Sequence, residues 1–118
     1  MKKIIFYSYL KCSTCKKAEK WLRSKGFEFQ LIDIVKEPPQ AYLLNQALEQ
    51  NSADKKKVFN TRGKAFKSIN LDINFLSREE IIQLLLSDGK LIKRPFLVYE
   101  EKKVILGFNE IEYAKQFL

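Results

Sequence analysis

Histidine is absent from this chain of 118 residues, and most common catalytic arrangements use it as a proton carrier or metal ligand. Cysteine is scarce as well, with two residues in all. Zinc takes a tetrahedral ligand set, which two cysteines cannot complete without carboxylates or a second chain, so we expect no metal. No apolar run approaches the ~20 residues of a membrane helix, and we expect no membrane association.

The first residues loosely imitate a secretory signal peptide, because Lys2 and Lys3 precede an apolar run at residues 4–10. This run has no small-residue cleavage site, and Lys11 interrupts it at once. We therefore interpret it as the first strand of a cytoplasmic protein. Two closely spaced cysteines in a chain without a targeting segment indicate redox chemistry rather than a structural disulfide framework.

Basic residues outnumber acidic ones, with 22 Lys and Arg against 14 Asp and Glu and a net charge of +8. This excess weakly favours acidic partners or anionic substrates. The basic residues are 18 Lys and 4 Arg spread along the chain, whereas proteins that recognise DNA sequence usually rely on Arg for base contacts. We expect a solvated basic surface and no direct DNA binding.

The N-terminal part of the chain has the pattern of a βαβ unit. Residues 3–9 are typical of a buried strand, and residues 27–34 predict a second strand. Between them we expect a helix that Ser13 or Thr14 caps and that ends at Gly26. Two strands joined by a helix over ~30 residues pair in parallel.

The middle of the chain is helical in pattern, and its C-terminal part returns to strands. Helices are predicted at residues 40–50, 55–59 and 77–88. Short apolar runs at 96–99 and 104–107 are spaced for an antiparallel hairpin, and Asn109 caps a last helix at 110–117.

This order of elements defines the expected fold class. It is β-α-β, a helical insert at about 38–90, then β-β-α. Apart from the insert, this is the α/β, thioredoxin-like arrangement with a four-stranded mixed sheet. The length of the chain argues for one domain over residues 1–118.

The motif Cys12-Ser13-Thr14-Cys15 stands between the first strand and the first helix. Its cysteines are at i and i+3, and Cys12 is at the helix N-terminus, where free N–H groups and the helix dipole favour an anion. Lysines 11, 16 and 17 add positive charge, and Lys11 is also a candidate contact for an anionic substrate. Such surroundings lower a thiol pKa from ~8.5 to about 3.5–7.5. We predict a nucleophilic Cys12 and a resolving thiol at Cys15.

A structural alternative is that the cysteines pack the helix onto the sheet as small apolar residues. It is the stronger for Cys15, which continues the apolar stripe to Ala18 and Leu22. Tyr7 and Tyr9 precede the motif, and we assign both to core packing rather than to its pocket.

Arg94-Pro95 forms the second signal, at the start of the third predicted strand. In thioredoxin-like proteins a cis proline at this place faces the cysteine motif. Arg94 would then stabilise a thiolate or a bound oxyanion by charge-assisted hydrogen bonds, and Pro95 would line the same site. The alternative is an ordinary loop proline beside a surface arginine.

The third signal is Asn60-Thr61-Arg62-Gly63, a polar turn between predicted helices. Such a turn can bind an anion, with Asn60 and Arg62 as its candidate ligands. A plain loop between helices is an equal alternative.

Several segments together resemble the family of arsenate reductases (ArsC) and Spx regulators, and the resemblance covers essentially the whole chain. They are the cysteine motif with Lys11 and residues 16–18, the turn Glu37-Pro38-Pro39, Asn60-Thr61-Arg62-Gly63, Leu91-Ile92-Lys93-Arg94-Pro95 and Gly107-Phe108-Asn109-Glu110.

The resemblance implies a thioredoxin-like fold with a helical insert. Arsenate reductases linked to glutaredoxin use a nucleophilic cysteine, which matches Cys12, and arginines that bind the oxyanion. One of those arginines matches Arg94. The others would fall at Asn60, with Arg62 nearby, and at Gly107, so arsenate binding should be weaker by ~1.5–3 kcal/mol for each charge-assisted bond that is missing.

Spx-type regulators imply a different function for the same fold. They use a Cys-x-x-Cys redox switch and bind the C-terminal domain of the RNA polymerase α subunit. Cys15, Arg62 and the segment 107–110 favour this alternative, whereas Asp54 stands where those regulators have glycine. We expect a thiol–disulfide redox protein without a bound cofactor, reduced by glutathione, glutaredoxin or thioredoxin, and keep the regulator as the alternative.

Overall fold

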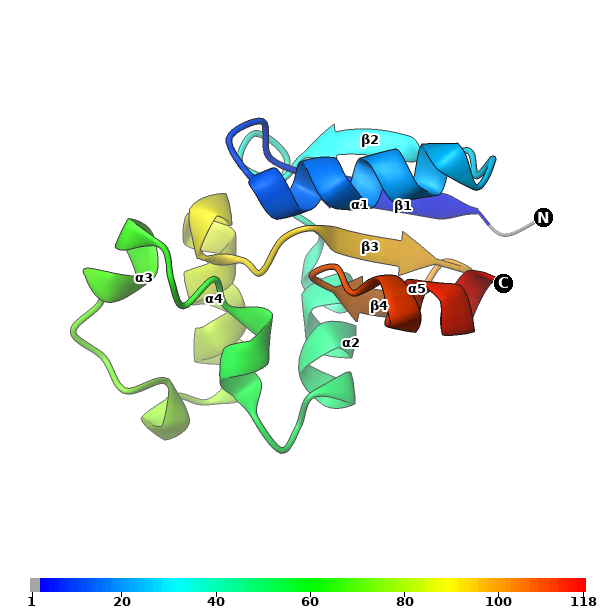
Figure 1. Ribbon diagram of the computed structural model, residues 1–118. Helices are drawn as coiled ribbons and strands as arrows, with labels where there is room; N and C mark the ends of the chain where they lie inside the picture. The colour runs from blue at the N-terminus through cyan, green and yellow to red at the C-terminus, as the bar shows by residue number, and fades with distance from the viewer. Residues whose placement is uncertain (1–2) are drawn as a thin grey trace.

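The computed structural model describes residues 3–118 and contains a four-stranded mixed sheet (Figure 1). Its strands are β1 (Ile4–Ser8), β2 (Gln30–Asp33), β3 (Phe96–Tyr99) and β4 (Lys103–Leu106), in the order β2-β1-β3-β4. β1 pairs with β2 in parallel, and β3 is antiparallel to both of its neighbours, β1 and β4. The predicted α/β class, the parallel βαβ unit and the C-terminal hairpin are confirmed.

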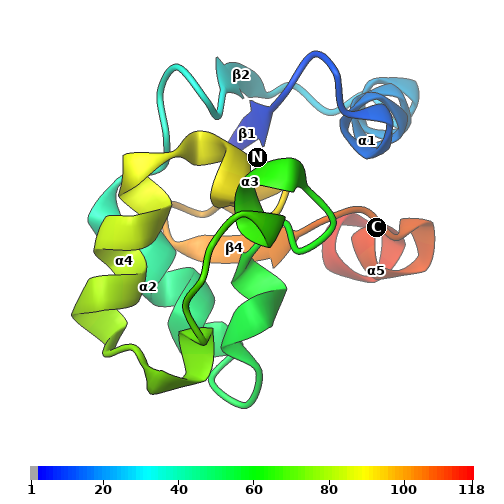
Figure 2. The same cartoon turned by 90° about the vertical axis from the view of Figure 1, so that its left-hand side faces the viewer.

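Helices cover both faces of this sheet. α1 (Ser13–Ser24) and α5 (Glu110–Phe117) lie on one face, and α2 (Ala41–Gln50) and α4 (Arg78–Ser87) lie on the other side, as the end-on view of Figure 2 shows. No helix within residues 3–118 is both long enough and apolar enough to cross a membrane.

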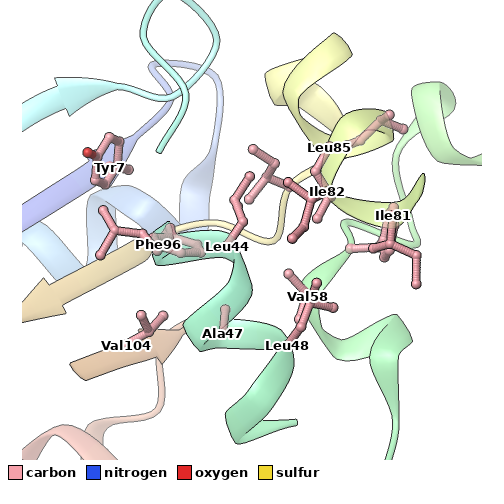
Figure 3. Packing of buried hydrophobic residues seen from close by; sticks show 14 of the residues in the cluster. Tyr7, Leu44, Ala47, Leu48, Val58, Ile81, Ile82, Leu85, Phe96 and Val104 are labelled. Atoms are coloured by element: carbon pink, nitrogen blue, oxygen red, sulfur yellow. The ribbon is translucent and has the colours of Figure 1, made fainter. Parts of the chain in front are cut away.

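Alternation along the strands produces the two layers of the core, because successive side chains of a strand point to opposite faces. In β1, Ile4 and Phe6 pack with α1 and α5, whereas Tyr7 packs with α2 and α4. β3 divides in the same way, with Leu97 on the first face and Phe96 on the second. Figure 3 shows the second layer, where side chains of α2 and α4 meet those of the sheet.

The insert between β2 and β3 contains short helices as well as α2 and α4. They are η1 (Lys55–Val58), α3 (Lys64–Lys67), η2 (Ile73–Phe75) and η3 (Gly89–Leu91). Only the first of these was predicted from the sequence, since three or four residues are too few for a helical period to appear. η1, η2 and η3 each begin after an aspartate whose carboxylate accepts a backbone N–H bond.

Two predicted boundaries are wrong. Cys12, and not Ser13 or Thr14, is the N-cap of α1. The second strand begins at Gln30 and not at residue 27, because the N–H of Phe27 bonds to the carbonyl of Leu22 in closing the helix.

Gly89 is a point of close contact between the insert and the chain leaving β2. A Cβ atom at this position would lie 2.8 Å from the Cα of Val35 and would overlap the carbonyl oxygen of Ile34. The sequence indicated only a helix end here. The structure shows that glycine is needed because backbone approaches backbone.

The β3–β4 turn contains two residues in the left-handed region, Glu100 with φ 52° and Glu101 with φ 69°. This conformation costs a residue with a side chain roughly 1–2 kcal/mol. Glu101→Gly is therefore expected to raise the free energy of unfolding by up to about 1 kcal/mol in urea denaturation. Lys102→Gly is the matched control: its φ is not positive, so destabilisation is expected. Equal effects of the two substitutions would contradict the explanation by backbone strain.

Candidate functional site

The C-terminal end of β1 and the N-terminal end of β3 lie side by side at one end of the strands, because β1 and β3 are antiparallel and Tyr7 pairs with Phe96. Cys12 follows β1, and Arg94 and Pro95 directly precede β3. The topology therefore brings together two motifs that are far apart in the sequence (Figure 1). The Arg94–Pro95 peptide bond is cis, as expected.

Cys12 caps α1 with its sulfur atom. Its Sγ accepts the backbone N–H of Cys15 over 3.2 Å, in the position where a serine or aspartate oxygen usually caps a helix. Hydrogen bonds from the thiol and the N–H of Cys15, together with the positive charge and hydrogen bond of Arg94, lower the pKa of Cys12 to about 6 against the opposing effect of burial. At pH 7 a thiol with this pKa is roughly nine-tenths thiolate.

Cys15 has the opposite character. Its side chain is 1% exposed and lies on the face of α1 that also buries Ala18 and Leu22, as the packing alternative had it. Its hydrogen bond to the Cys12 sulfur and its burial raise the pKa of Cys15 far above the usual range, although Tyr9 and Ser8 donate hydrogen bonds that oppose the rise. Both cysteines are free thiols. The pair thus consists of a half-exposed thiolate and a buried thiol that keeps its proton.

Arg94 is held by two contacts besides its interaction with Cys12. The guanidinium carbon lies 4.8 Å from the centroid of the Tyr9 ring, and Nη1 donates to the carbonyl oxygen of Lys90 over 3.3 Å. The N–H of Gly107 donates to the carbonyl oxygen of Pro95 over 2.9 Å and so ties the same loop to β4. These contacts direct the positive charge toward the sulfur.

Tyr9 is a positioning residue that the sequence analysis assigned to core packing. Because its ring stacks on Arg94, Tyr9→Leu is expected to raise the pKa of Cys12 by roughly half a unit, the equivalent of a cation–π contact of about 0.5–1 kcal/mol. The pH dependence of iodoacetamide alkylation, with the site identified by mass spectrometry, measures this pKa. Tyr9→Phe keeps the ring and should leave the midpoint unchanged; a shift of similar size in Tyr9→Phe would contradict a role of the ring.

Asn60 and Arg62 line a polar groove of about 1130 Å³ that extends to Thr14 of the cysteine motif. Thr14, which lies between the two cysteines, and Lys93, which precedes Arg94, line the groove, whereas Cys12, Cys15 and Arg94 do not. The turn is anchored next to the site, since the N–H of Asn60 donates to the carbonyl oxygen of Leu91 over 2.8 Å.

The lysines near the motif contribute less than the sequence indicated. Lys11, Lys16 and Lys17 are exposed, and the causes of the lowered Cys12 pKa are Cys15 and Arg94 instead. Lys11 directly precedes Cys12 in an exposed turn.

Lys93 occupies the space that a side chain at position 107 would need. Gly107 has φ +73°, and a Cβ there would lie 3.2 Å from Cε of Lys93. The position matched to an oxyanion-binding arginine in the family resemblance therefore has the Lys93 side chain close to it. Nothing in the sequence pattern signals this contact, because it joins β4 to the segment before β3.

A metal site is not apparent in the described part of the chain. Within residues 3–118, no group of three or more Cys, Asp, Glu or His side chains is clustered as ligands would be. The chemistry that these residues offer is that of a thiolate next to a thiol.

Comparison with known proteins agrees with this architecture. The chain matches the model of the ArsC family over residues 7–116. It is 40% identical over 116 residues to the uncharacterized protein YusI of Bacillus subtilis, covering 97% of this chain and 98% of that protein. The global transcriptional regulator Spx of Lactiplantibacillus plantarum is 33% identical over 112 residues, which cover 95% of this chain and 84% of the regulator.

A solved structure extends the similarity to three dimensions. A possible arsenate reductase from Streptococcus mutans superposes with a TM-score of 0.89 at 39% identity, covering 99% of this chain and 100% of that one. The family match spans the cysteine motif, the insert and the C-terminal hairpin. The chain is a member of the ArsC family.

Proposed function

We propose that this protein is a cytoplasmic thiol–disulfide oxidoreductase in which Cys12 is the nucleophile, Cys15 the resolving thiol and Arg94 the group that stabilises the thiolate. The observation that supports it best is the opposite shift of the two thiol pKa values, lowered for Cys12 and raised for Cys15. Cys12 is largely ionised at neutral pH, while Cys15 retains its proton and donates it in a hydrogen bond.

The exchange begins when the Cys12 thiolate attacks one sulfur of a substrate disulfide. A mixed disulfide forms, and the other substrate sulfur leaves as a thiolate. Cys15 then loses its proton and attacks Sγ of Cys12, which releases the second substrate thiolate and leaves a Cys12–Cys15 disulfide. Two electrons have passed to the substrate. Glutathione, glutaredoxin or thioredoxin then reduces the Cys12–Cys15 disulfide back to two thiols.

Resolution by Cys15 becomes easier once the mixed disulfide has formed. The largest cause of its raised pKa is the hydrogen bond to Cys12, and the charge of that thiolate raises the pKa further. Both effects disappear when Cys12 is bonded to the substrate. The hydrogen bonds from Tyr9 and Ser8 then remain to stabilise the Cys15 thiolate.

Arsenate is the second substrate to test, because a solved structure of 39% identity is described as a possible arsenate reductase and because Arg94 provides a cation at the thiolate. Arsenate reduction is measured with glutathione and glutaredoxin in the unmodified chain, Cys12→Ser and Cys15→Ser. Activity lost in Cys12→Ser and retained in Cys15→Ser would support reduction of arsenate with glutathione as resolving thiol. Disulfide exchange without arsenate reduction would limit the function to thiol–disulfide chemistry.

A redox-controlled regulator is the alternative, favoured by the similarity to Spx and by the presence of the second cysteine. Its test is binding of the RNA polymerase α C-terminal domain to the oxidised and to the reduced chain. Binding that depends on the Cys12–Cys15 disulfide, without turnover of any disulfide substrate, would favour the regulator over the oxidoreductase.

A further inference from the structure

The polar groove beside the thiol pair joins elements from several parts of the chain. It is lined by Thr14 in the first turn of α1, by the turn at residues 60–62, by β4 and by the start of α5. Its volume of about 1130 Å³ exceeds what a small anion needs. Its position next to the cysteine motif makes it a surface on which a macromolecular substrate can lie while its disulfide reaches Cys12.

The groove has an excess of unpaired positive charge. Five basic and two acidic side chains line it; they are Lys56, Lys57, Arg62, Lys93 and Lys103, with Asp54 and Glu112. Among residues 3–118, Lys103 is the only one of these cations in an ion pair, with Glu100 at 2.9 Å. Asp54 is engaged as the cap of η1, where it accepts the N–H of Lys56. Within the described part of the chain, the other four cations that line the groove therefore have no carboxylate partner.

The wall formed by β4 offers main-chain hydrogen bonds as well. β4 is an edge strand, so only every second residue hydrogen-bonds to β3. The N–H of Gly107 bonds to Pro95 on the β3 side, so the backbone groups of Val104 and Leu106 point away from β3. The side-chain amide of Gln50 satisfies both outward-facing backbone groups of Val104, accepting its N–H and donating to its C=O. Leu106, which lines the groove, has no such partner among residues 3–118.

We propose that this groove binds an extended, acidic segment of a protein whose disulfide exchanges with Cys12. Carboxylates of the segment neutralise Lys56, Lys57 and Arg62, and its main chain pairs with Leu106 at the open edge of the sheet. The inference rests on the proposed function and names the class of partner: a protein disulfide in an acidic environment. The covalent step is the exchange described above, and the groove raises the concentration of the disulfide at the thiolate.

Three short peptides of equal length test this proposal, each with one cysteine in a mixed disulfide with 2-thiopyridine. Glutamates flank the cysteine in the first, glutamines in the second and lysines in the third. The rate of thiopyridone release is divided, for each chain, by its rate with neutral dithiodipyridine. At low salt the glutamate peptide should react ~10-fold faster than the glutamine peptide, and the lysine peptide more slowly. The advantage should shrink as added salt shortens the Debye length to ~3 Å at 1 M.

A pair of charge-matched variants separates the groove from the net charge of the protein. The double substitution Lys56→Glu and Lys57→Glu should abolish the preference for glutamate. The double substitution Lys20→Glu and Lys36→Glu changes the net charge equally at exposed positions outside the groove and should keep it. Loss of the preference in both variants, or equal rates for the three peptides in the unmodified chain, would overturn the proposal.

Two further outcomes are distinguishable. No reaction of Cys12 with dithiodipyridine would refute the proposed function itself, whatever the peptides do. Stronger competition by a DNA duplex than by a cysteine-free glutamate peptide would assign the groove to nucleic acid and overturn the inference while leaving the thiol chemistry intact.

Discussion

Replacing Cys12 by serine is expected to lower the rate of disulfide exchange by at least about a thousandfold. The reactive form of cysteine is the thiolate, whereas a serine hydroxyl stays protonated near neutral pH. The measurement is release of thiopyridone from dithiodipyridine at pH 7. In the unmodified chain the rate should rise with pH around a midpoint of about 6, because the thiolate of Cys12 forms as pH passes its pKa.

Cys15→Ser provides the matched control. It leaves the nucleophile in place but removes the resolving thiol, so the mixed disulfide should accumulate on Cys12 and appear as a mass adduct. In Cys15→Ala, which also removes the side-chain donor, the pH midpoint should lie above 6, since the hydrogen bond from the Cys15 thiol is the largest contribution to the lowered pKa of Cys12. Exchange that survives in Cys12→Ser, or an adduct found on Cys15, would reverse the assigned roles.

Gly89→Ala is expected to destabilise the fold by about 3 kcal/mol or more. The added methyl group would overlap the carbonyl oxygen of Ile34 and approach the Cα of Val35 to 2.8 Å. These are backbone atoms of the segment leaving β2, and they cannot rotate away as a side chain can. Chemical denaturation in urea measures the loss as a shift of the midpoint at constant slope.

Gly26→Ala separates a steric clash from the conformational preference of glycine. Gly26 has φ +79°, but nothing lies within 4 Å of a Cβ at this position. It should therefore cost only the roughly 1–2 kcal/mol of a left-handed alanine. A loss at position 89 no larger than the loss at position 26 would contradict the contact with Ile34.

The fold could be predicted to a large extent because its elements have local signals. Residues 4–8 lie in the apolar run that predicted a buried strand, and the capping box of Ser77 with Glu80 marks the start of α4. Asn109 likewise caps α5. Short helices such as η2 and the close contact of Gly89 were missed, since neither has a period and the second depends on a segment distant in sequence.

The residues of the candidate site could be predicted from the sequence, but the causes of the lowered pKa of Cys12 could be predicted only in part. The motif Cys12–Cys15 and the pair Arg94-Pro95 were identified from spacing and element order, and the structure brings them together. The sequence predicted that N–H groups at the helix start, nearby lysines and Arg94 would lower the pKa of Cys12. The structure supports the N–H of Cys15 and Arg94, adds the thiol of Cys15 as the largest cause, and gives the lysines no part. Tyr9 packs partly buried against the core, as predicted, and its ring also holds the guanidinium of Arg94, which was not foreseen.

The strands, the longer helices and the two reactive cysteines could be recognised without tertiary information, because hydrophobic period, caps and i, i+3 spacing are properties of neighbouring residues. The motif already predicted Cys12 as nucleophile and Cys15 as resolving thiol, but the burial and the Arg94 contact that separate their pKa values come from tertiary packing. Cys12 remains half exposed beside Arg94, whereas Cys15 is buried on the face of α1 that packs against the sheet. That difference, and the basic groove beside it, arise from burial and from contacts between residues far apart in the chain, which no local pattern encodes.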